Sequence, residues 1–309
     1  MLVVTGASGL LGANAHLSAV ELGWDAVGLC HRHVLRDPTL RVATVDLTDE
    51  SSTRKLLFDL RPNAILHCAA ATDVDWCEDN PTLANAINVQ ASAVLADIAS
   101  ALNARLLYVS TDAVFDGKKG EYIETDEPSP LNVYARSKLV GEREVLRRHP
   151  LATVARVNIY GWNAQNKDSL AEWALRRLEA GQDVPGFADV FFTPILVNDL
   201  VPFLFRMLHD GMAGVYHVAG SERISKFEFA CRVAATFGFD PARITPCLVK
   251  DMNRRATRPL DISLNTEKIS MALGRSMPDV ATGLARFREL RNRQYPQQLK
   301  RYLDHGRRP

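Results

Sequence analysis

The sequence predicts an α/β fold: a doubly wound parallel sheet covered by helices, followed by a smaller, discontinuous C-terminal α/β lobe. Three observations lead to this prediction. Short, nearly apolar runs alternate with helical patterns through residues 1–160. A glycine-rich turn follows the first apolar run directly. After about residue 160 the alternation loosens and polar loops become longer. Apolar strands that alternate with helices indicate a parallel sheet buried on both faces.

The first 160 residues contain the regular part of this pattern. Each expected strand is rich in Val, Leu, Ile and Ala, and each expected helix carries apolar residues on one face. We expect strands at 2–6, 25–30, 41–46, 64–70, 106–111 and 152–157, and helices at 10–22, 49–60, 81–102 and 133–148. Residues 1–160 are therefore predicted to form a dinucleotide-binding domain.

Residues 161–309 are predicted to form mainly the substrate-binding lobe. A polar loop at 162–168 precedes a helix at 169–180, and a strand is expected at 214–220. Because that strand is apolar, the chain should return to the sheet near 193–220. The remaining expectations are a helical 197–208, a helix at 225–238, an irregular segment at 254–264 and two helical stretches to the end.

Composition limits the classes of partner. The formal net charge is +1 and 47% of the residues are hydrophobic, which favours neither nucleic acid nor anionic lipid as a partner. No apolar run approaches the roughly 20 residues of a membrane span. The chain begins with the strand-like MLVVTGASG, which has no basic-plus-apolar leader pattern, so we expect a cytoplasmic protein. The Arg-rich 285–309 is better explained as a solvated helix face and tail than as a nucleic-acid arm.

Cysteine and histidine spacing predicts no metal site. The five cysteines show neither a CxxC pair nor zinc-type spacing: Cys30, Cys68, Cys77, Cys231 and Cys247. Cys30 and Cys68 lie in apolar runs and are expected to be buried. A reactive thiol at Cys77 is a weaker hypothesis. The eight histidines are scattered.

The glycine-rich turn TGASGLLG predicts a dinucleotide site. It lies between a predicted strand and a predicted helix, the context in which three glycines let the backbone approach a pyrophosphate at a helix N-terminus. The alternative is a purely structural turn. The predicted cofactor contacts of this Rossmann-type turn are Gly6, Ser8, Gly9, Leu10, Leu11 and Gly12.

The end of the second predicted strand, GLCHRH, favours NADP(H) over NAD(H). NAD-selective folds usually place an acidic residue here, and this segment has none. Arg32, with His31 or His33, can pair with a 2′-phosphate. The alternative is that Arg32 is an ordinary surface arginine. After the third strand, Asp46 and Leu47 are predicted to lie at the adenine.

Tyr134 and Lys138 lie four residues apart in NVYARSKLVGERE. Residues at this spacing share one helix face, so a phenol and an ammonium can point at the same space. The spacing by itself fits equally well an ordinary helix start with a charged exposed face.

The motifs together resemble a known family. TGASGLLG, HCAAATDVDWCEDNP, NV at 88–89, YVSTDAVFDG, VYARSKLVGERE and RVNIYGW occur in this order. This chain resembles the extended short-chain dehydrogenases/reductases, in particular the dTDP-4-dehydrorhamnose reductase branch that also includes the regulatory subunit of methionine adenosyltransferase. GVYHVAGSERISKFEFACRVAATFGFD and RPLDISL resemble the substrate lobe of that branch.

The resemblance implies a catalytic triad. Tyr134 is the implied proton donor, Lys138 its partner and a ligand of the nicotinamide ribose, and Thr111 the third hydroxyl. A free phenol has a pKa near 10, so a nearby ammonium and an oxidised nicotinamide ring should favour the phenolate and lower that pKa.

The resemblance also implies contacts with cofactor and substrate. Ala69, Ala70 and Ala71, after the fourth strand, are small enough for the cofactor ribose to lie against the backbone. The implied substrate residues are Thr72, Thr111, Asp112 and Arg258, with Asp73 at the same end. For Arg258 the alternative is a salt bridge between the two lobes.

These motifs predict NADPH-dependent reduction of the keto group of a nucleotide-activated 4-keto-6-deoxy sugar. Ala113 stands where the family usually has an aromatic residue, and RVNIYGWN lacks a family tryptophan, so the identity of the sugar is open. One alternative is a sugar-nucleotide epimerase or dehydratase with retained NAD. A second is a non-catalytic, NADP-binding regulatory subunit. The oligomeric state is open, with a homodimer as one alternative.

Overall fold

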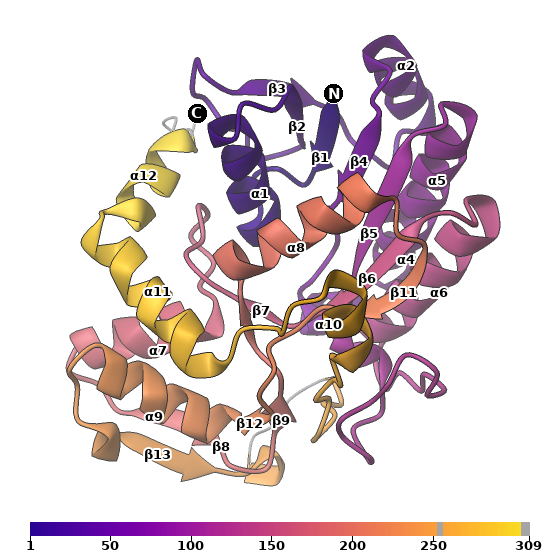
Figure 1. The fold of residues 1–309 in the computed structure, drawn as a ribbon. Coiled ribbons are helices and arrows are strands. Elements are labelled where there is room, and N and C mark those ends of the chain that lie inside the picture. Colours follow the sequence, from indigo (N-terminus) through magenta and orange to yellow (C-terminus); the bar gives the residue numbers. More distant parts are fainter. Residues whose placement is uncertain (252–255, 304–309) are drawn as a thin grey trace.

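The computed structural model describes residues 1–251 and 256–303, and its centre is a seven-stranded parallel sheet (Figure 1). The strand order is β11-β6-β5-β4-β1-β2-β3. Its members are β1 (Leu2–Thr5), β2 (Ala26–Cys30), β3 (Arg41–Thr44), β4 (Ala64–His67), β5 (Arg105–Thr111), β6 (Thr153–Val157) and β11 (Gly214–His217). All six strands expected in the first 160 residues are confirmed, as is the strand expected at 214–220.

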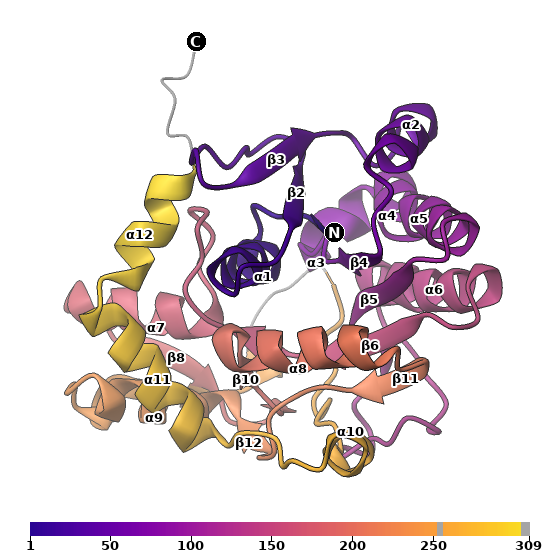
Figure 2. The same ribbon diagram turned by 45° about the horizontal axis from the view of Figure 1, so that its top comes forward.

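Helices cover both faces of this sheet (Figure 2). One face carries α1 (Leu10–Glu21) and α8 (Val197–Asp210), which pack against each other. The other carries α2 (Glu50–Leu60), α5 (Ala91–Ala101) and α6 (Val133–Arg148). Because both faces are covered, the strands are apolar on both sides, and Val3 and Val4 are both fully buried. The predicted doubly wound class is confirmed.

The helix predicted at 81–102 is continuous but irregular. It consists of α4 (Pro81–Asn85), a π-helical turn η1 (Ala86–Gln90) and α5. Such single π turns concentrate at functional sites because they redirect side chains. The turn contains Asn88, a fully buried residue that contacts the site described below.

The smaller lobe combines short strands with the C-terminal helices. It contains α7 (Leu170–Glu179), β8 (Val184–Phe187), α9 (Lys226–Thr236) and β13 (Ile244–Cys247), with β8 and β13 paired in parallel. Trp162 and Phe287 stack in its core with ring centroids 4.0 Å apart.

Several elements of the chain were not predicted. Three helices close the described chain, where two were expected: α10 (Glu267–Leu273), α11 (Val280–Asn292) and α12 (Tyr295–Tyr302). The short α3 (Val74–Asp79), β7 (Ile159–Tyr160), β9 (Phe191–Phe192), β10 (Ile195–Leu196) and β12 (Ile224–Ser225) were also missed. Segments of two to six residues are too short to show a hydrophobic period. Part of the irregular 254–264 lies outside the described residues.

No helix in residues 1–251 and 256–303 combines the length and the apolar character that crossing a bilayer requires.

Two histidines are buried in the sheet and are neutral. His67 lies between two hydroxyls, with Nδ1 2.7 Å from Oγ1 of Thr5 and Nε2 2.9 Å from Oγ of Ser92. Burial, with Lys138 as a second cause, lowers the pKa of His67 to about 3. Burial and Arg156 lower the pKa of His217 to about 3 as well.

Stability should consequently fall in mild acid. Both histidines have folded pKa values below the unfolded value near 6.5, so the unfolded chain binds more protons below that pH and stability declines as pH falls towards 3. At pH 5 the cost is about 2 kcal/mol per histidine. Asp112 contributes about 1.4 kcal/mol of stability at pH 5 in the opposite direction, because its pKa in the folded chain is raised.

Urea unfolding at pH 7.5 and pH 5 measures the difference in the free energy of unfolding. A His217→Gln variant should lose less stability between these two pH values, and an equal loss contradicts the assignment.

Candidate active site

The glycine turn between β1 and α1 is built for close backbone contact. Gly6 has a φ of 62°, in the left-handed region, and a Cβ there would lie 2.8 Å from Cα of Ala69. A Cβ on Gly12 would lie 2.1 Å from the carbonyl oxygen of Gly6. Gly9 caps α1 with no side-chain hydrogen bond, so the first N–H groups of the helix stay available for an anion. These features fit a dinucleotide pyrophosphate.

The polar loop at 162–168 lies beside this turn. Nε2 of Gln165 donates to the carbonyl oxygen of Ser8 at 2.9 Å. Nζ of Lys167 donates to Oγ1 of Thr72 at 3.2 Å, and Nδ2 of Asn163 donates to the carbonyl oxygen of Lys167 at 2.6 Å. Gln165 and Lys167 were not predicted as site residues. These contacts join positions far apart in sequence, and no local pattern reports them.

The alanine segment after β4 is fixed from two sides. The backbone N–H of Ala69 donates to Oγ1 of Thr5 at 3.1 Å. Ala71 is held by Asn88, which accepts from its N–H at 2.8 Å and donates to its carbonyl oxygen at 3.1 Å. The segment with Ala70 therefore passes directly beside Gly6, as a cofactor-binding role requires. Asn88 was missed as a site residue, although its NV motif carried part of the resemblance.

Cys77 is not a reactive thiol. It is fully buried, its Sγ donates to the carbonyl oxygen of Ala71 at 3.7 Å, and burial followed by the charges of Asp73 and Glu78 raises its pKa to about 11. A thiol in this state remains protonated at neutral pH and is a poor nucleophile.

The residues expected at the 2′-phosphate lie at the carboxyl ends of β2 and β3. Nε2 of His31 is 3.6 Å from Oδ2 of Asp46. The other oxygen of Asp46 accepts from the backbone and hydroxyl of Thr48 at 2.9 and 2.7 Å. These hydrogen bonds, followed by the charges of His31 and Arg32, lower the pKa of Asp46. The sequence did not reveal that a carboxylate lies beside the predicted phosphate ligands.

The triad residues converge at the carboxyl end of β5. Thr111 ends this strand, and Tyr134 begins α6, whose first turn is capped by Asn132 accepting from the N–H of Ala135 at 2.9 Å. The Thr111 side chain lowers the pKa of the Tyr134 phenol, which places its hydroxyl close to the phenolic oxygen. Nζ of Lys138 donates to the carbonyl oxygen of Val109 at 2.8 Å.

The charge states of the pair differ from the expectation. Burial raises the pKa of Tyr134 to about 12, and the Thr111 hydrogen bond lowers it only in part. Burial lowers the pKa of Lys138 to about 7, while the charge of Glu142 raises it. In the chain alone Tyr134 is therefore a neutral phenol, the form that donates a proton, and the expected lowering by Lys138 is not observed.

Asp112 is buried next to Thr111. One carboxylate oxygen accepts from Oγ1 of Thr111 at 3.1 Å and the other from Nδ2 of Asn158. Burial raises the pKa of Asp112 to about 6, against the lowering effect of these two donors. Asn158 belongs to RVNIYGWN, the segment that departs from the family pattern, and its side chain fixes Asp112. The N–H of Ala113 donates to Oγ1 of Thr111 at 3.2 Å.

Arg258 forms the salt bridge that was the alternative for this residue. Its guanidinium lies 3.3 Å from Oδ2 of Asp75 in α3, and Oδ1 of Asp75 accepts from the N–H of Ala256 at 3.2 Å. Nδ2 of Asn132 donates to the carbonyl oxygen of Thr257 at 3.1 Å. The C-terminal segment is thereby attached to the start of α6, beside Tyr134.

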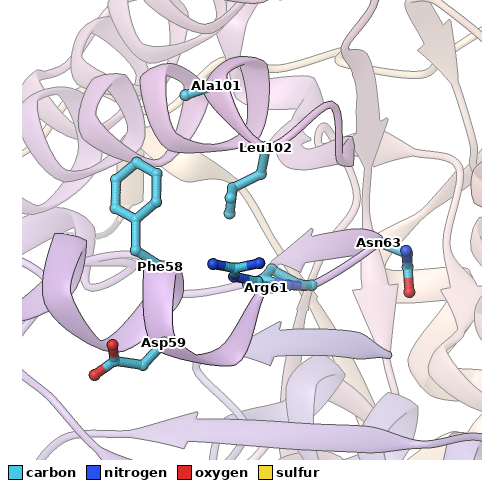
Figure 3. Close-up of a pocket in the computed structure, with 7 residues that line it drawn as sticks. Phe58, Asp59, Arg61, Asn63, Ala101 and Leu102 are labelled. Atoms are coloured by element: carbon cyan, nitrogen blue, oxygen red, sulfur yellow. The ribbon is translucent and has the colours of Figure 1, made fainter.

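An open hollow of about 600 Å³ lies elsewhere, at the C-terminal ends of α2 and α5 (Figure 3). Its lining residues are Phe58, Asp59, Arg61, Pro62, Asn63, Ala101 and Leu102. Asn63 directly precedes β4, so the hollow lies at the amino ends of the strands. In open parallel sheets ligands bind at the carboxyl ends, where Thr111 lies. Within residues 1–251 and 256–303, no three His, Cys, Asp or Glu side chains are grouped as metal ligands.

Comparison with known proteins identifies the family. Residues 1–291 match the family model described as RmlD substrate binding domain. The probable low-salt glycan biosynthesis reductase Agl14 of Haloferax volcanii is 34% identical over 288 residues, which cover 91% of this chain and 95% of that protein. Methionine adenosyltransferase 2 subunit beta of Pongo abelii is 32% identical over 286 residues, which cover 89% of this chain and 84% of that protein.

Solved structures of reductases superpose on nearly the whole chain. The dTDP-4-dehydrorhamnose reductase of Bacillus anthracis in complex with NADP has a TM-score of 0.83 at 28% identity, covering 93% of this chain and 98% of that one. The Clostridium acetobutylicum orthologue has a TM-score of 0.81 at 25% identity, covering 94% of this chain and 99% of that one. The chain therefore belongs to the RmlD substrate binding domain family and is an NAD(P)-dependent oxidoreductase of the extended short-chain dehydrogenase/reductase type.

Proposed function

We propose that this protein uses NADPH to reduce the keto group of a nucleotide-activated 4-keto-6-deoxy sugar. The observation that carries the proposal is the group of Thr111, Tyr134 and Lys138, with buried Asp112 beside it, at the same edge of the sheet as the glycine turn. The family membership and the reductase structures with similar folds support it.

Each residue of the group has a distinct task in this proposal. When bound, the reduced nicotinamide supplies the hydride that reaches the keto carbon. Tyr134 donates its phenolic proton to the oxygen that becomes an alkoxide, and the Thr111 hydroxyl turns from Asp112 to donate a hydrogen bond to the same oxygen. Lys138 holds the ribose hydroxyls and places a positive charge near the phenolate that Tyr134 becomes.

The substrate contacts are assigned by chemistry. Asp112 accepts a hydrogen bond from a sugar hydroxyl, most strongly above pH 6, where it is ionised. Thr72 and Arg258 face the diphosphate of the nucleotide in this proposal, and Arg258 then exchanges Asp75 for a phosphate oxygen. The protein is expected to act as a cytoplasmic enzyme.

The direct test is reduction of defined substrates. Purified protein and NADPH should be mixed with dTDP-4-dehydrorhamnose, dTDP-4-keto-6-deoxyglucose and the corresponding UDP and GDP keto sugars, while the absorbance of NADPH is followed. The expected result is consumption of NADPH with formation of the nucleotide-linked 6-deoxy sugar, which carries a hydroxyl in place of the keto group. A complete lack of turnover with every nucleotide keto sugar, by protein that binds NADPH, would falsify the proposed reaction.

A second candidate function is that of a regulatory subunit. The similarity to methionine adenosyltransferase 2 subunit beta, 32% identical, is the observation that favours it. In that case the chain should co-purify with a methionine adenosyltransferase catalytic subunit and change its kinetics. A Tyr134→Phe variant should retain this effect, whereas it should lose a reductase activity.

A further inference from the structure

A buried group of charges lies behind Lys138, on the side away from Tyr134. Its centre is Glu142, one helical turn after Lys138 on α6, with a side chain 3% exposed. Arg156 on β6, 4% exposed, faces it. Neither residue contributes a reacting group to the proposed reaction. Ionised side chains are costly to bury, so such a pair requires full hydrogen bonding or a specific role.

The Glu142 carboxylate is bound on several sides. Nε of Arg156 donates to Oε1 at 3.0 Å and Nη2 to Oε2 at 2.7 Å, the bidentate arrangement that suits a guanidinium. The Ser110 hydroxyl also donates to Oε1. Ser110 follows Val109 on β5, whose carbonyl oxygen accepts from Lys138. The carboxylate is thus held to the same strand segment as the ammonium.

Other groups around Lys138 are neutral at pH 7. Tyr108 on β5 lies under the ammonium, with its ring centroid 3.9 Å from Nζ. His67, at the end of β4, has a pKa lowered to about 3, and the pKa of Cys68 is raised to about 12 by burial. Tyr134 is protonated as well. Glu142 is therefore the negative charge facing Lys138 among these neighbours.

His217 faces Arg156 from β11. Nε2 of this histidine lies 3.5 Å from Nη1 of Arg156, and its low pKa keeps it uncharged. The arrangement therefore consists of one carboxylate that pairs with Arg156 and lies one helical turn from Lys138, whose pKa its charge raises. A guanidinium does not lose its proton in proteins, whereas a buried ammonium does so readily. Lys138 is therefore the cation of this group that can change its charge.

We propose that Glu142 and Arg156 are positioning residues that together set the charge of Lys138: Glu142 retains the proton on Lys138, and Arg156 limits how strongly Glu142 does so. The inference deepens the proposed function, since Lys138 is its ribose-binding and charge-supplying residue. It stands on the contacts of α6, β5 and β6 and requires no knowledge of the sugar.

The two halves of the ion pair predict opposite effects. Glu142→Gln leaves Arg156 and Lys138 as two uncompensated cations, so the midpoint at which Lys138 loses its proton should fall by about one to two pH units. Arg156→Gln leaves Glu142 to Lys138 alone, so the midpoint should rise by about one to two pH units. The double variant should lie between them. Both single variants break the same salt bridge, so a merely structural role predicts shifts of the same sign.

The titration is measured on the full chain by NMR of ¹³Cε-labelled lysine, with Lys138→Met used to identify the signal. Glu144→Gln is the matched control: it removes a carboxylate of the same helix that pairs with Arg147 and Arg148, and the Lys138 midpoint should stay unchanged. If Glu142→Gln does not fold, the upward shift in Arg156→Gln remains the test.

Activity gives a separate readout. If the proposed reduction occurs, the alkaline limb of its pH profile should move down in Glu142→Gln and up in Arg156→Gln. Opposite shifts of the NMR midpoint without any reductase activity support this inference and count against the proposed reaction. Shifts of the same sign, or none, overturn the inference whatever the activity.

Discussion

Replacing Tyr134 with Phe is expected to lower kcat for the keto-sugar reduction by about 10²- to 10⁴-fold, the usual contribution of a general acid. The phenol lies close to the Thr111 hydroxyl, and burial keeps it protonated, with a pKa raised to about 12. Phe preserves the ring and removes only the hydroxyl whose proton would reach the alkoxide. Single-turnover consumption of NADPH measures the chemical step directly.

Binding should separate this effect from misfolding. The dissociation constant for NADPH, followed by cofactor fluorescence, should change by less than about threefold, since one hydroxyl is lost and the fold is retained. Tyr216→Phe is a matched control, because Tyr216 lies on β11 and contacts Lys268, away from the triad. An unchanged kcat in Tyr134→Phe would rule out Tyr134 as the proton donor.

The second large effect concerns cofactor choice. Arg32→Ala is expected to weaken NADPH binding by about tenfold to hundredfold and to leave NADH nearly unchanged, because one charge-assisted contact contributes about 1.5–3 kcal/mol. Titration of both cofactors into parent and variant measures this.

Asp46 lies beside the residues predicted to bind the 2′-phosphate. Its carboxylate lies 3.6 Å from Nε2 of His31, so a bound 2′-phosphate would compete with it for this side chain. Arg61→Ala is the control, because Arg61 lines the hollow at the amino ends of the strands. This variant should bind NADPH and NADH as the parent does. If the parent binds NADH as tightly as NADPH, or Arg32→Ala weakens both alike, the assignment of Arg32 is wrong.

Local sequence patterns predicted the sheet and the helices that cover it. Strands such as β1 and β6 are apolar throughout because both faces of the sheet are covered, and this property is visible in any single run. The glycine turn could also be predicted locally, because Gly12 packs against the backbone of Gly6 only six residues earlier. Tyr134 and Lys138 share a helix face through their spacing.

The short strands of the smaller lobe and the third C-terminal helix could not be predicted. β8 contains Pro185 and Gly186, residues that usually interrupt strands, and it is stabilised by pairing with β13 some 60 residues later. α12 follows α11 after a left-handed residue, Gln294, which no turn signal marks. Long-range pairing decided these elements.

The sequence by itself therefore determined the fold class and the glycine turn, because each depends on residues close together in the chain, whereas the triad was implied by the resemblance of several motifs to a family. Tertiary structure decided the environment of those residues. It placed Glu142 against Arg156, Asn158 against Asp112 and Lys167 against Thr72. The pKa of a group depends on its burial and on charges within a few ångströms, and these are fixed only when distant segments pack together.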